Sequence, residues 1–252
     1  MPDKKIEIIG LELPLVKKGD DISSQINKAV RRVGGLRSGD ILVVSSKVVS
    51  LAEGRVIDLS DVRPSPTAKR LARRTGQPPE FVEVILREAD RVLKVMKGAI
   101  LTLKDGHVCA NAGADMSNAA PGHAILWPKN PLYSSRKIMR SLCKKPAGVI
   151  IADSVVRPLR LGTVGQAIGW AGFSPVVDCR GQPDLYGKPL RITFRALADQ
   201  IATAAQLVTG EGNEKRPAAV IRGLDVPTEK SGAAPVIPPE RCLYCGVKGW
   251  VK

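Results

Sequence analysis

Apolar positions with helical spacing identify the helical parts of the chain. Asp20 or Asp21 can cap a helix whose apolar residues recur every three or four positions as far as about Val33. A proline at the first helical position supports two further helices. The other predicted helices are Pro66–Arg74, Pro79–Val95, Leu132–Cys143 and a long helix that follows Phe194 and runs to about Val208.

Shorter apolar runs rich in β-branched residues identify the strands. One of them turns polar midway, at Ser45-Ser46-Lys47, and buried strands rarely carry such groups without a partner for them. Helices and strands mix without a strict β-α-β rhythm, which predicts an α+β fold with mixed sheets and flanking helices. The predicted strands are Lys5–Ile9, Asp40–Ser50, Ala99–Leu103, His107–Ala110, Ala124–Trp127, Gly148–Asp153, Leu190–Phe194 and Ala218–Ile221.

Composition is that of an ordinary globular protein, with 44% hydrophobic and 25% charged residues among 252. No apolar run reaches the roughly 18 residues of a membrane span. The N-terminal Met1–Lys5 lacks the apolar stretch of a signal peptide, so we expect a cytoplasmic protein with no membrane partner. From about Asp225 the composition shifts to Pro, Gly and Lys. We therefore expect one folded domain over residues 1–225, with up to two subdomains, and a tail over 226–252.

The tail contains a lone C-x-x-C, formed by Cys242 and Cys245. One such pair supplies at most half of a zinc site. The five cysteines are otherwise scattered, unlike the disulfide framework of a small secreted protein. The role of the pair stays open.

The net charge of +15, from 39 basic and 24 acidic residues, favours a polyanionic partner or serves solubility alone. Aromatic residues make up only 4% of the chain, which argues against the base stacking of nucleic-acid-binding proteins. Neither G-x-G-x-x-G nor G-x-x-x-x-G-K-[ST] occurs, so the common Rossmann and P-loop devices are excluded. A phosphorylated substrate is therefore the favoured polyanionic partner, and solubility alone stays the other explanation of the charge.

Polar breaks at the ends of apolar elements are the candidate sites, because functional residues gather there. In the segment Asn111–Asn118, Gly113 permits a turn that projects Asp115 and Asn118. This segment is either a metal-binding loop that also touches phosphate or an Asx-rich turn.

Two further breaks follow later in the chain. Asp153 and Ser154, at the end of a predicted strand, offer oxygen ligands to Mg²⁺ or Mn²⁺, or else form a helix cap or salt bridge. In Gly210-Glu211-Gly212 the glycines let the backbone approach a ligand, or else they end a helix.

Taken together, Asp115, Asp153 and Glu211 are hard oxygen ligands from separate loops. Two divalent ions held among them would bridge nucleotide phosphates and neutralise the charge of phosphoryl transfer. Ser46 and Lys47 would add donors to the same ligand. The candidate catalytic residues are Asp115 and Asp153, and no catalytic triad is evident.

Six segments carry a further signal: Gly10–Lys17, Asp40–Arg55, Val108–Asn118, Val149–Ser154, Asp184–Gly187 and Arg222–Leu224. In this order and spacing they resemble the coenzyme F-420-0:L-glutamate ligases. The resemblance covers about residues 4–225. The motifs are specific as a set, although each is weak alone.

The resemblance implies a fold peculiar to these gamma-glutamyl ligases and an intertwined homodimer. It also implies GTP, two Mn²⁺ or Mg²⁺ ions and a monovalent ion such as K⁺. The terminal carboxylate of F-420-0 would be activated as an acyl phosphate, and the amine of L-glutamate would then displace phosphate to form an amide. The implied metal ligands are Asp115, Asp153, Ser154 and Glu211, and the implied nucleotide contacts are Leu13, Pro14, Leu15, Val16, Ser46, Lys47, Asn118 and the loop Thr209–Arg216 with Gly210, Glu211 and Gly212.

Two positions depart from the family pattern. Leu51 replaces a lysine thought to touch the nucleotide, which removes a charge-assisted contact worth about 1.5–3 kcal/mol, and Lys47 is the nearest substitute. Val156 replaces a flexible glycine. The sequence therefore indicates a GTP-dependent ligase of F-420-0. The alternatives are a paralogous nucleotide- and metal-dependent amide ligase for a different phosphorylated acid and, as a third class, a basic nucleic-acid-binding protein.

Overall fold

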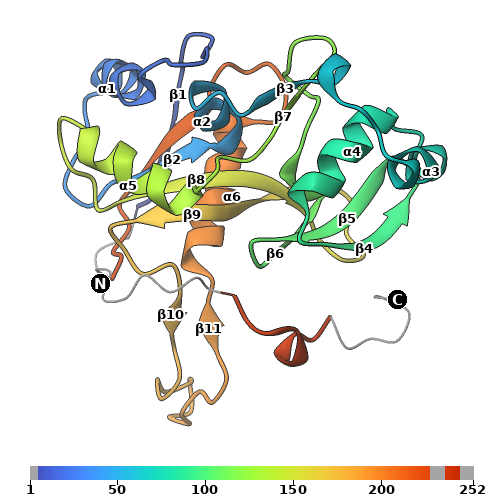
Figure 1. Cartoon of the computed structure of the whole chain (residues 1–252). Coiled ribbons are helices and arrows are strands. Elements are labelled where there is room, and N and C mark those ends of the chain that lie inside the picture. The colour runs from blue at the N-terminus through green and yellow to red at the C-terminus, as the bar shows by residue number, and fades with distance from the viewer. Residues whose placement is uncertain (1–4, 228–235, 245–252) are drawn as a thin grey trace. The chain divides into compact units, whose positions relative to one another are not determined.

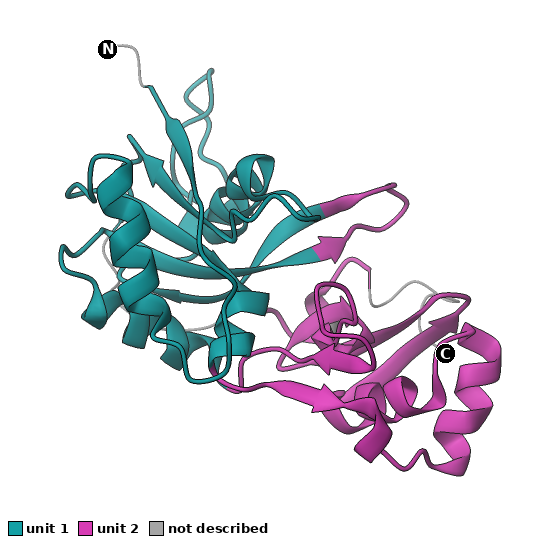
Figure 2. Cartoon of the chain, turned by 90° about the horizontal axis from the view of Figure 1, so that it is seen from above, with its two compact units in different colours: residues 1–52, 130–154, 164–235 teal, residues 53–129, 155–163, 236–252 magenta. Residues whose placement is uncertain are grey.

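The computed structural model describes residues 5–227 and 236–244 (Figure 1). The chain divides into two compact units (Figure 2). Unit 1 comprises Met1–Ala52, Asn130–Ser154 and Val164–Pro235, and unit 2 comprises Glu53–Lys129, Val155–Thr163 and Val236–Lys252. None of the helices in the described ranges is long and apolar enough to cross a membrane.

A five-stranded mixed sheet forms the centre of unit 1. Its fully buried strands read as continuous β-branched runs, as expected for strands covered on both faces. The third and fourth strands are parallel, with Ile41 opposite Gly148 and Ser45 opposite Ala152. In spatial order the strands are β1 (Glu7–Leu11), β12 (Ala218–Arg222), β2 (Ile41–Ser45), β8 (Gly148–Val156) and β9 (Thr163–Ala171).

Helix α6 (Leu197–Thr209) packs on this sheet through Ala198, Ile201, Ala202 and Ala205. The helix lies so close to β9 that a Cβ on Gly165 would overlap the backbone of Ala202. The other elements of unit 1 are α1 (Ile22–Arg32), α2 (Ser46–Ala52), α5 (Pro131–Ser141) and the short hairpin of β10 (Val177–Asp178) and β11 (Phe194–Arg195).

A buried ion pair ties the sheet of unit 1 to the loop that precedes β2. Arg222 donates from Nε and Nη2 to the two carboxylate oxygens of Asp40, at 3.0 and 2.9 Å, and also to the carbonyl oxygen of Gly35 at 3.0 Å. The hydrogen bonds to Asp40 raise the pKa of Arg222. Because both side chains are buried, removal of either would leave a charge without its partner.

Unit 2 contains a three-stranded antiparallel sheet and a two-stranded pair. Its core is formed by apolar side chains of two helices that pack against these strands, with Phe81, Val82 and Ile85 fully buried. The elements are β3 (Val56–Asp58), a 3-10 helix (Leu59–Asp61), α3 (Pro66–Thr75), α4 (Pro79–Glu88), β4 (Arg91–Met96), β5 (Ala99–Lys104), β6 (His107–Ala110), a 3-10 helix (Asn111–Gly113), β7 (His123–Ile125) and a last 3-10 helix (Pro239–Arg241).

The α+β class with mixed sheets and flanking helices is confirmed. Helix capping is also confirmed, because Asp21 accepts a hydrogen bond from the backbone N–H of Ser24 at the start of α1. The boundary between residues 225 and 226 stays a prediction. Cys242 belongs to the described residues and Cys245 lies outside them.

Four predicted elements were wrong in extent. The strand Asp40–Ser50 ends at Ser45, and α2 begins at Ser46. The helix Pro79–Val95 ends at Glu88, and Arg91–Met96 forms an edge strand because β5 pairs with it. The strand Gly148–Asp153 continues to Val156, so that Asp153 does not end it. The strand Leu190–Phe194 is reduced to Phe194–Arg195.

Candidate active site

Ser46 and Asp153 meet where β2 ends beside β8. The parallel register places Ser45 opposite Ala152. The next residues of the two segments, Ser46 and Asp153, therefore lie beside each other just beyond the end of β2. The hydroxyl of Ser46, the first residue of α2, donates to Oδ1 of Asp153 at 2.8 Å. Ser46 is buried and Asp153 is half-buried. The polar residues that interrupted the predicted strand therefore have a carboxylate as their partner.

The end of α6 brings two more side chains to Ser154. The Ser154 hydroxyl donates to Oε1 of Glu211 at 2.7 Å. Gln206, in the last turn of α6, donates from Nε2 to the Ser154 hydroxyl oxygen at 3.1 Å and also to Oε1 of Glu211. We refer to these two hydrogen-bonded groups, Ser46 with Asp153 and Ser154 with Gln206 and Glu211, as the oxygen cluster.

Gly210 allows the chain to turn from α6 into the oxygen cluster. Its φ of +66° lies in the left-handed region, which side chains rarely adopt. A Cβ at this position would also overlap the carboxylate of Glu214. That carboxylate accepts a hydrogen bond from the backbone N–H of Gly212 at 2.8 Å. Gly210 is thus favoured by the backbone conformation, whereas the exposed Glu214 side chain can move aside.

Gln206 is the member of the cluster that sequence reasoning missed. It lies within an ordinary amphipathic helix and belongs to no recognisable motif. The only available signal was its place one turn before Gly210, from which its side chain reaches the residue after that glycine.

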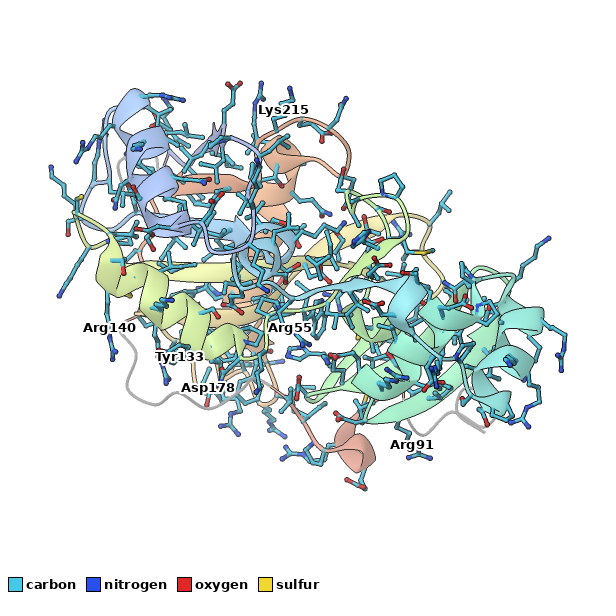
Figure 3. All side chains as sticks on the ribbon, turned by 45° about the horizontal axis from the view of Figure 1, so that its top comes forward. Arg55, Arg91, Tyr133, Arg140, Asp178 and Lys215 are labelled. Carbon is cyan, nitrogen blue, oxygen red and sulfur yellow. The ribbon has the colours of Figure 1, made fainter. Side chains whose placement is uncertain are left out.

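Two of the segments predicted to contact the nucleotide lie side by side. The backbone N–H of Leu13 donates to the carbonyl oxygen of Lys215 at 3.2 Å. Arg216 and Glu12 form a salt bridge, with 3.8 Å between Nε and Oε1. Lys215 is labelled in Figure 3. Leu13 and Val16 are buried, whereas Leu15 is exposed. The same loop, Thr209–Arg216, thus supplies Glu211 to the oxygen cluster and a backbone partner to Leu13.

Asp115 and Asn118 belong to unit 2. Asp115 exchanges two backbone hydrogen bonds with Ile125, at 2.9 and 2.8 Å, and its Oδ1 accepts from the backbone N–H of Ser117 at 2.7 Å. The segment therefore forms an Asx turn. Asn111, Ala112 and Asn118 all have positive φ values, of 54°, 53° and 58°, which is a concentration of strain typical of functional loops.

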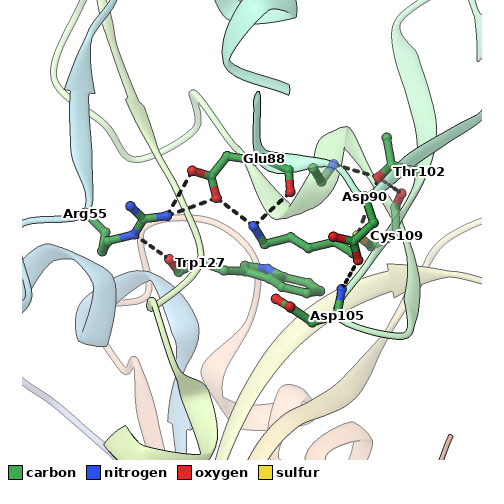
Figure 4. A network of polar contacts seen from close by, with 9 residues as sticks. Arg55, Glu88, Asp90, Thr102, Asp105, Cys109 and Trp127 are labelled. Carbon is green, nitrogen blue, oxygen red and sulfur yellow. Dashed lines mark hydrogen bonds and ion pairs between the residues drawn. The ribbon is translucent and has the colours of Figure 1, made fainter. Parts of the chain in front are cut away.

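A network of charged groups in unit 2 binds the segment that follows β7, the strand that pairs with this loop (Figure 4). Glu88 accepts from Nη2 of Arg55 at 2.9 Å and from Nζ of Lys104 at 2.6 Å, while Nε of Arg55 donates to the carbonyl oxygen of Trp127 at 3.0 Å. Burial raises the pKa of Glu88, but Lys104 and Arg55 outweigh it, so that this pKa lies below its usual value. Trp127 in turn packs on Gly113, next to Asp115.

No three His, Cys, Asp or Glu side chains of the described ranges are arranged to hold a metal ion. The oxygen cluster holds two carboxylate–hydroxyl pairs at consecutive residues of β8, Asp153 with Ser46 and Ser154 with Glu211. These hard oxygen donors fit Mg²⁺ or Mn²⁺, since Mg²⁺ in nucleotide-dependent enzymes is commonly held by one or two carboxylates together with substrate phosphates. The predicted approach of Asp115 to these residues stays a prediction.

Comparison with known proteins supplies the family. The model of the F420-0:Gamma-glutamyl ligase family matches residues 10–223. The chain belongs to this family. Three relatives described as "Coenzyme F420:L-glutamate ligase" come from Methanopyrus kandleri, Methanocaldococcus jannaschii and Archaeoglobus fulgidus. They are 45%, 43% and 42% identical to the chain, over 91%, 94% and 90% of its length and 91%, 95% and 91% of their own.

Membership of the F420-0:Gamma-glutamyl ligase family confirms the resemblance found in the six sequence segments. The matched range contains every residue of the oxygen cluster. It also contains Asp115 and Asn118, the predicted site residues of unit 2.

Proposed function

We propose that this protein is a GTP-dependent ligase that attaches L-glutamate to coenzyme F-420-0 through an amide bond. Family membership supports the reaction class, and relatives that match nearly end to end are named for ligation of glutamate to coenzyme F420. At the level of the site, the oxygen cluster carries the proposal. It pairs Asp153 with Ser46 and the next residue, Ser154, with Glu211, so that two hydrogen-bonded oxygen groups from three separate parts of the chain meet at consecutive residues of β8.

The reaction proceeds in two displacements. An oxygen of the terminal carboxylate of F-420-0 first attacks the γ-phosphorus of GTP, a phosphorus–oxygen bond to GDP breaks, and an acyl phosphate forms. The amine nitrogen of glutamate then attacks the acyl carbon, the carbon–oxygen bond to phosphate breaks, and the amine gives up a proton. The products are the amide, GDP and phosphate.

The residues of the oxygen cluster are suited to hold divalent ions for this reaction, and we propose two such ions. Asp153, Ser154 and Glu211 would be ligands, and Asp115 of unit 2 is proposed as a further ligand. When bound, such an ion neutralises the charge that develops on the phosphates. Ser46 orients the Asp153 carboxylate by its hydrogen bond, and Gln206 orients Ser154 and Glu211 in the same way. A monovalent ion such as K⁺ is proposed from family resemblance alone.

The nucleotide contacts are proposed for the loop Leu13–Val16, the loop Thr209–Arg216, Ser46, Lys47 and Asn118. The hydrogen bond between Leu13 and Lys215 supports the joint use of the first two. Glu211 links the second loop to the oxygen cluster. Phosphate oxygens near that cluster would therefore lie within reach of both loops.

A second candidate is a paralogous ligase that acts on a different phosphorylated acid. Leu51 and Val156, which replace residues of the family pattern, favour this candidate. Both candidates share the nucleotide and the metal, so only the acceptor separates them.

We also propose a homodimer. The segment between β10 and β11 exposes Leu185, Tyr186 and Ile192, with 99%, 88% and 86% of their surfaces accessible. Large apolar side chains that cluster in this way mark interaction surfaces. Sedimentation of the wild-type protein beside a variant with Leu185→Ser and Ile192→Ser tests this. We expect a dimer that the variant converts to monomer, and a monomeric wild type would contradict it.

The ligase proposal is tested by incubating the protein with GTP, Mn²⁺, L-glutamate and F-420-0 and determining the mass of the product. We expect addition of a glutamyl residue that requires GTP, and its loss in Asp153→Asn. Asp61→Asn, which removes an exposed carboxylate outside the site, is the matched control and retains activity. Robust ligation of another acid, without reaction of F-420-0, would identify the paralogous enzyme.

A further inference from the structure

Helix α1 and the segment around α5 carry cationic residues and no acidic residue within their own lengths. Residues 22–32 contain three cationic residues and no acidic one, and residues 130–152 contain five and no acidic one. None of these eight takes part in a salt bridge within the described ranges. We refer to them as the basic face, and they are Lys28, Arg31, Arg32, Arg136, Lys137, Arg140, Lys144 and Lys145.

The two helices are joined at the C-terminal end of α5. Asn27 of α1 donates to the carbonyl oxygen of Ser141 at 3.2 Å, and its own side-chain oxygen accepts from the backbone N–H of Cys143 at 3.1 Å. Arg31 contacts Sγ of Cys143 at 3.8 Å. These bonds fix the loop that carries Lys144 and Lys145.

Two hollows flank this loop. The first, of about 260 Å³, is lined by Arg136, Met139, Arg140, Lys145, Ala171 and Gly172. Arg136 and Arg140 lie one helical turn apart and therefore share a face of α5, from which Arg140 projects in Figure 3. The second hollow, of about 440 Å³, includes Arg31 and Lys144. No carboxylate lines either hollow.

Gly172 is one of the residues that line the first hollow. Its φ of +92° lies in the left-handed region. A Cβ there would lie 2.5 Å from the carbonyl oxygen of Ala147 and 2.7 Å from Cε of Met139. A side chain at this position would therefore displace the wall that Met139 forms.

The first hollow lies near the start of β8, at the opposite end of this strand from Asp153. Lys145 precedes Gly148, the first residue of β8, and Ala147 donates its backbone N–H to the carbonyl oxygen of Asp40 at the start of β2. Asp153 stands five residues further along β8, about 16 Å away at the usual rise of a strand. A ligand in the first hollow thus occupies a site separate from the proposed reaction.

Helix dipoles explain only part of this charge. Arg31, Arg32 and Arg140 lie in the last turns of their helices, where a cation gains about 0.3–1 kcal/mol. Arg136 and Lys145 lie outside those turns. A helix dipole also does not explain why both segments lack acidic residues. The convergence of three cations on one hollow is the feature that points to an anion.

We propose that the first hollow binds a small molecule that carries a chain of two or three phosphates. Three cationic side chains around one concavity match several phosphate charges in a small volume. The fork of each guanidinium pairs with two phosphate oxygens at once. Tyr133, with 61% of its surface exposed, is the one aromatic residue on α5, so the interleaved aromatics that bind single-stranded nucleic acid are not found on this helix. The inference does not depend on the proposed ligase activity.

The test uses sodium tripolyphosphate as the probe, with chelator present to exclude divalent ions, and measures binding to the whole chain by calorimetry. The variant replaces Arg136, Arg140 and Lys145 by Gln. The control makes the same change of charge on α3, with Lys69→Gln, Arg70→Gln and Arg73→Gln, all three exposed and outside every salt bridge of the described ranges. A further variant, Asp153→Asn, reports on the oxygen cluster.

We expect the wild type to bind tripolyphosphate with one site. The first variant should weaken binding by about tenfold or more, since charge-assisted hydrogen bonds are lost, while the control and Asp153→Asn should bind as the wild type does. Equal weakening of tripolyphosphate binding in the control would show that binding depends only on the net charge of the protein, and this would overturn the proposal. No binding to the wild type would overturn it too, as would tighter binding of a short RNA that depends on the whole basic face.

Discussion

Gly113 is the position where a single methyl group tests the packing of the candidate loop most sharply. Its φ is +70°, and a Cβ there would overlap the indole ring of Trp127. Trp127 is 4% exposed, and its ring meets the ring of His107 edge to face at a centroid distance of 5.8 Å. The backbone carbonyl oxygen of Trp127 also accepts a hydrogen bond from Arg55. The indole therefore has no room to withdraw, and we expect Gly113→Ala to be strongly destabilising.

Gly122→Ala is the matched control, because Gly122 has a φ of +77° and no atom within 4 Å of a Cβ. Both variants pay about 1–2 kcal/mol for the left-handed backbone, and only Gly113→Ala adds the overlap, worth about 1–3 kcal/mol. Urea unfolding followed by circular dichroism should show this difference in the free energy of unfolding. The turnover of Gly113→Ala should also fall further, because Asp115 lies two residues on. Equal losses of stability in the two variants would refute the packing argument.

Three further outcomes are expected. Glu88→Gln should lower the free energy of unfolding by about 2–3 kcal/mol at neutral pH, since it leaves Lys104 and Arg55 without their carboxylate partner. Because the folded pKa of Glu88 is lowered, this stability is present above its unfolded pKa and is lost as pH falls through the folded value. The difference in the free energy of unfolding between wild type and variant should therefore disappear in acid. A difference that does not change with pH would contradict this. Ser154→Ala should raise the Mn²⁺ concentration for half-maximal ligation by about tenfold. The control Ser174→Ala, which removes a hydroxyl that donates to the carbonyl oxygen of Val176, should leave it unchanged. Equal Mn²⁺ requirements in the two variants would show that Ser154 is not a metal ligand. Leu51→Lys should lower the KM for GTP by about tenfold, as a charge-assisted contact is restored, and an unchanged KM would show that position 51 does not face the nucleotide.

Much of the fold was predictable where the signals are local. Asp21 caps α1, Pro66 begins α3, and His107–Ala110 forms a strand, each as the residue pattern indicated. The errors arose where tertiary contacts decide. Nothing in the sequence ends the apolar pattern of α4 at Glu88, and β4 forms because β5 pairs with it.

The start of α2 shows the same limit at the site itself. Val48 and Val49 favour a strand by their branching, yet Ser46 begins a helix at the point where its hydroxyl bonds to Asp153. The sequence could name Asp153, Ser154 and Glu211 as oxygen ligands. It could not show that Ser154 bonds to Glu211, because that contact depends on where α6 ends beside β8.

The most direct test of the central claim follows the oxygen atoms of the acceptor. F-420-0 labelled with ¹⁸O in its terminal carboxylate is ligated to glutamate by the protein with GTP, and the released phosphate is analysed by mass spectrometry. Activation of that carboxylate by phosphoryl transfer predicts that each phosphate released with an amide carries one labelled oxygen. Amide formation with unlabelled phosphate would contradict the acyl-phosphate reaction proposed for this protein.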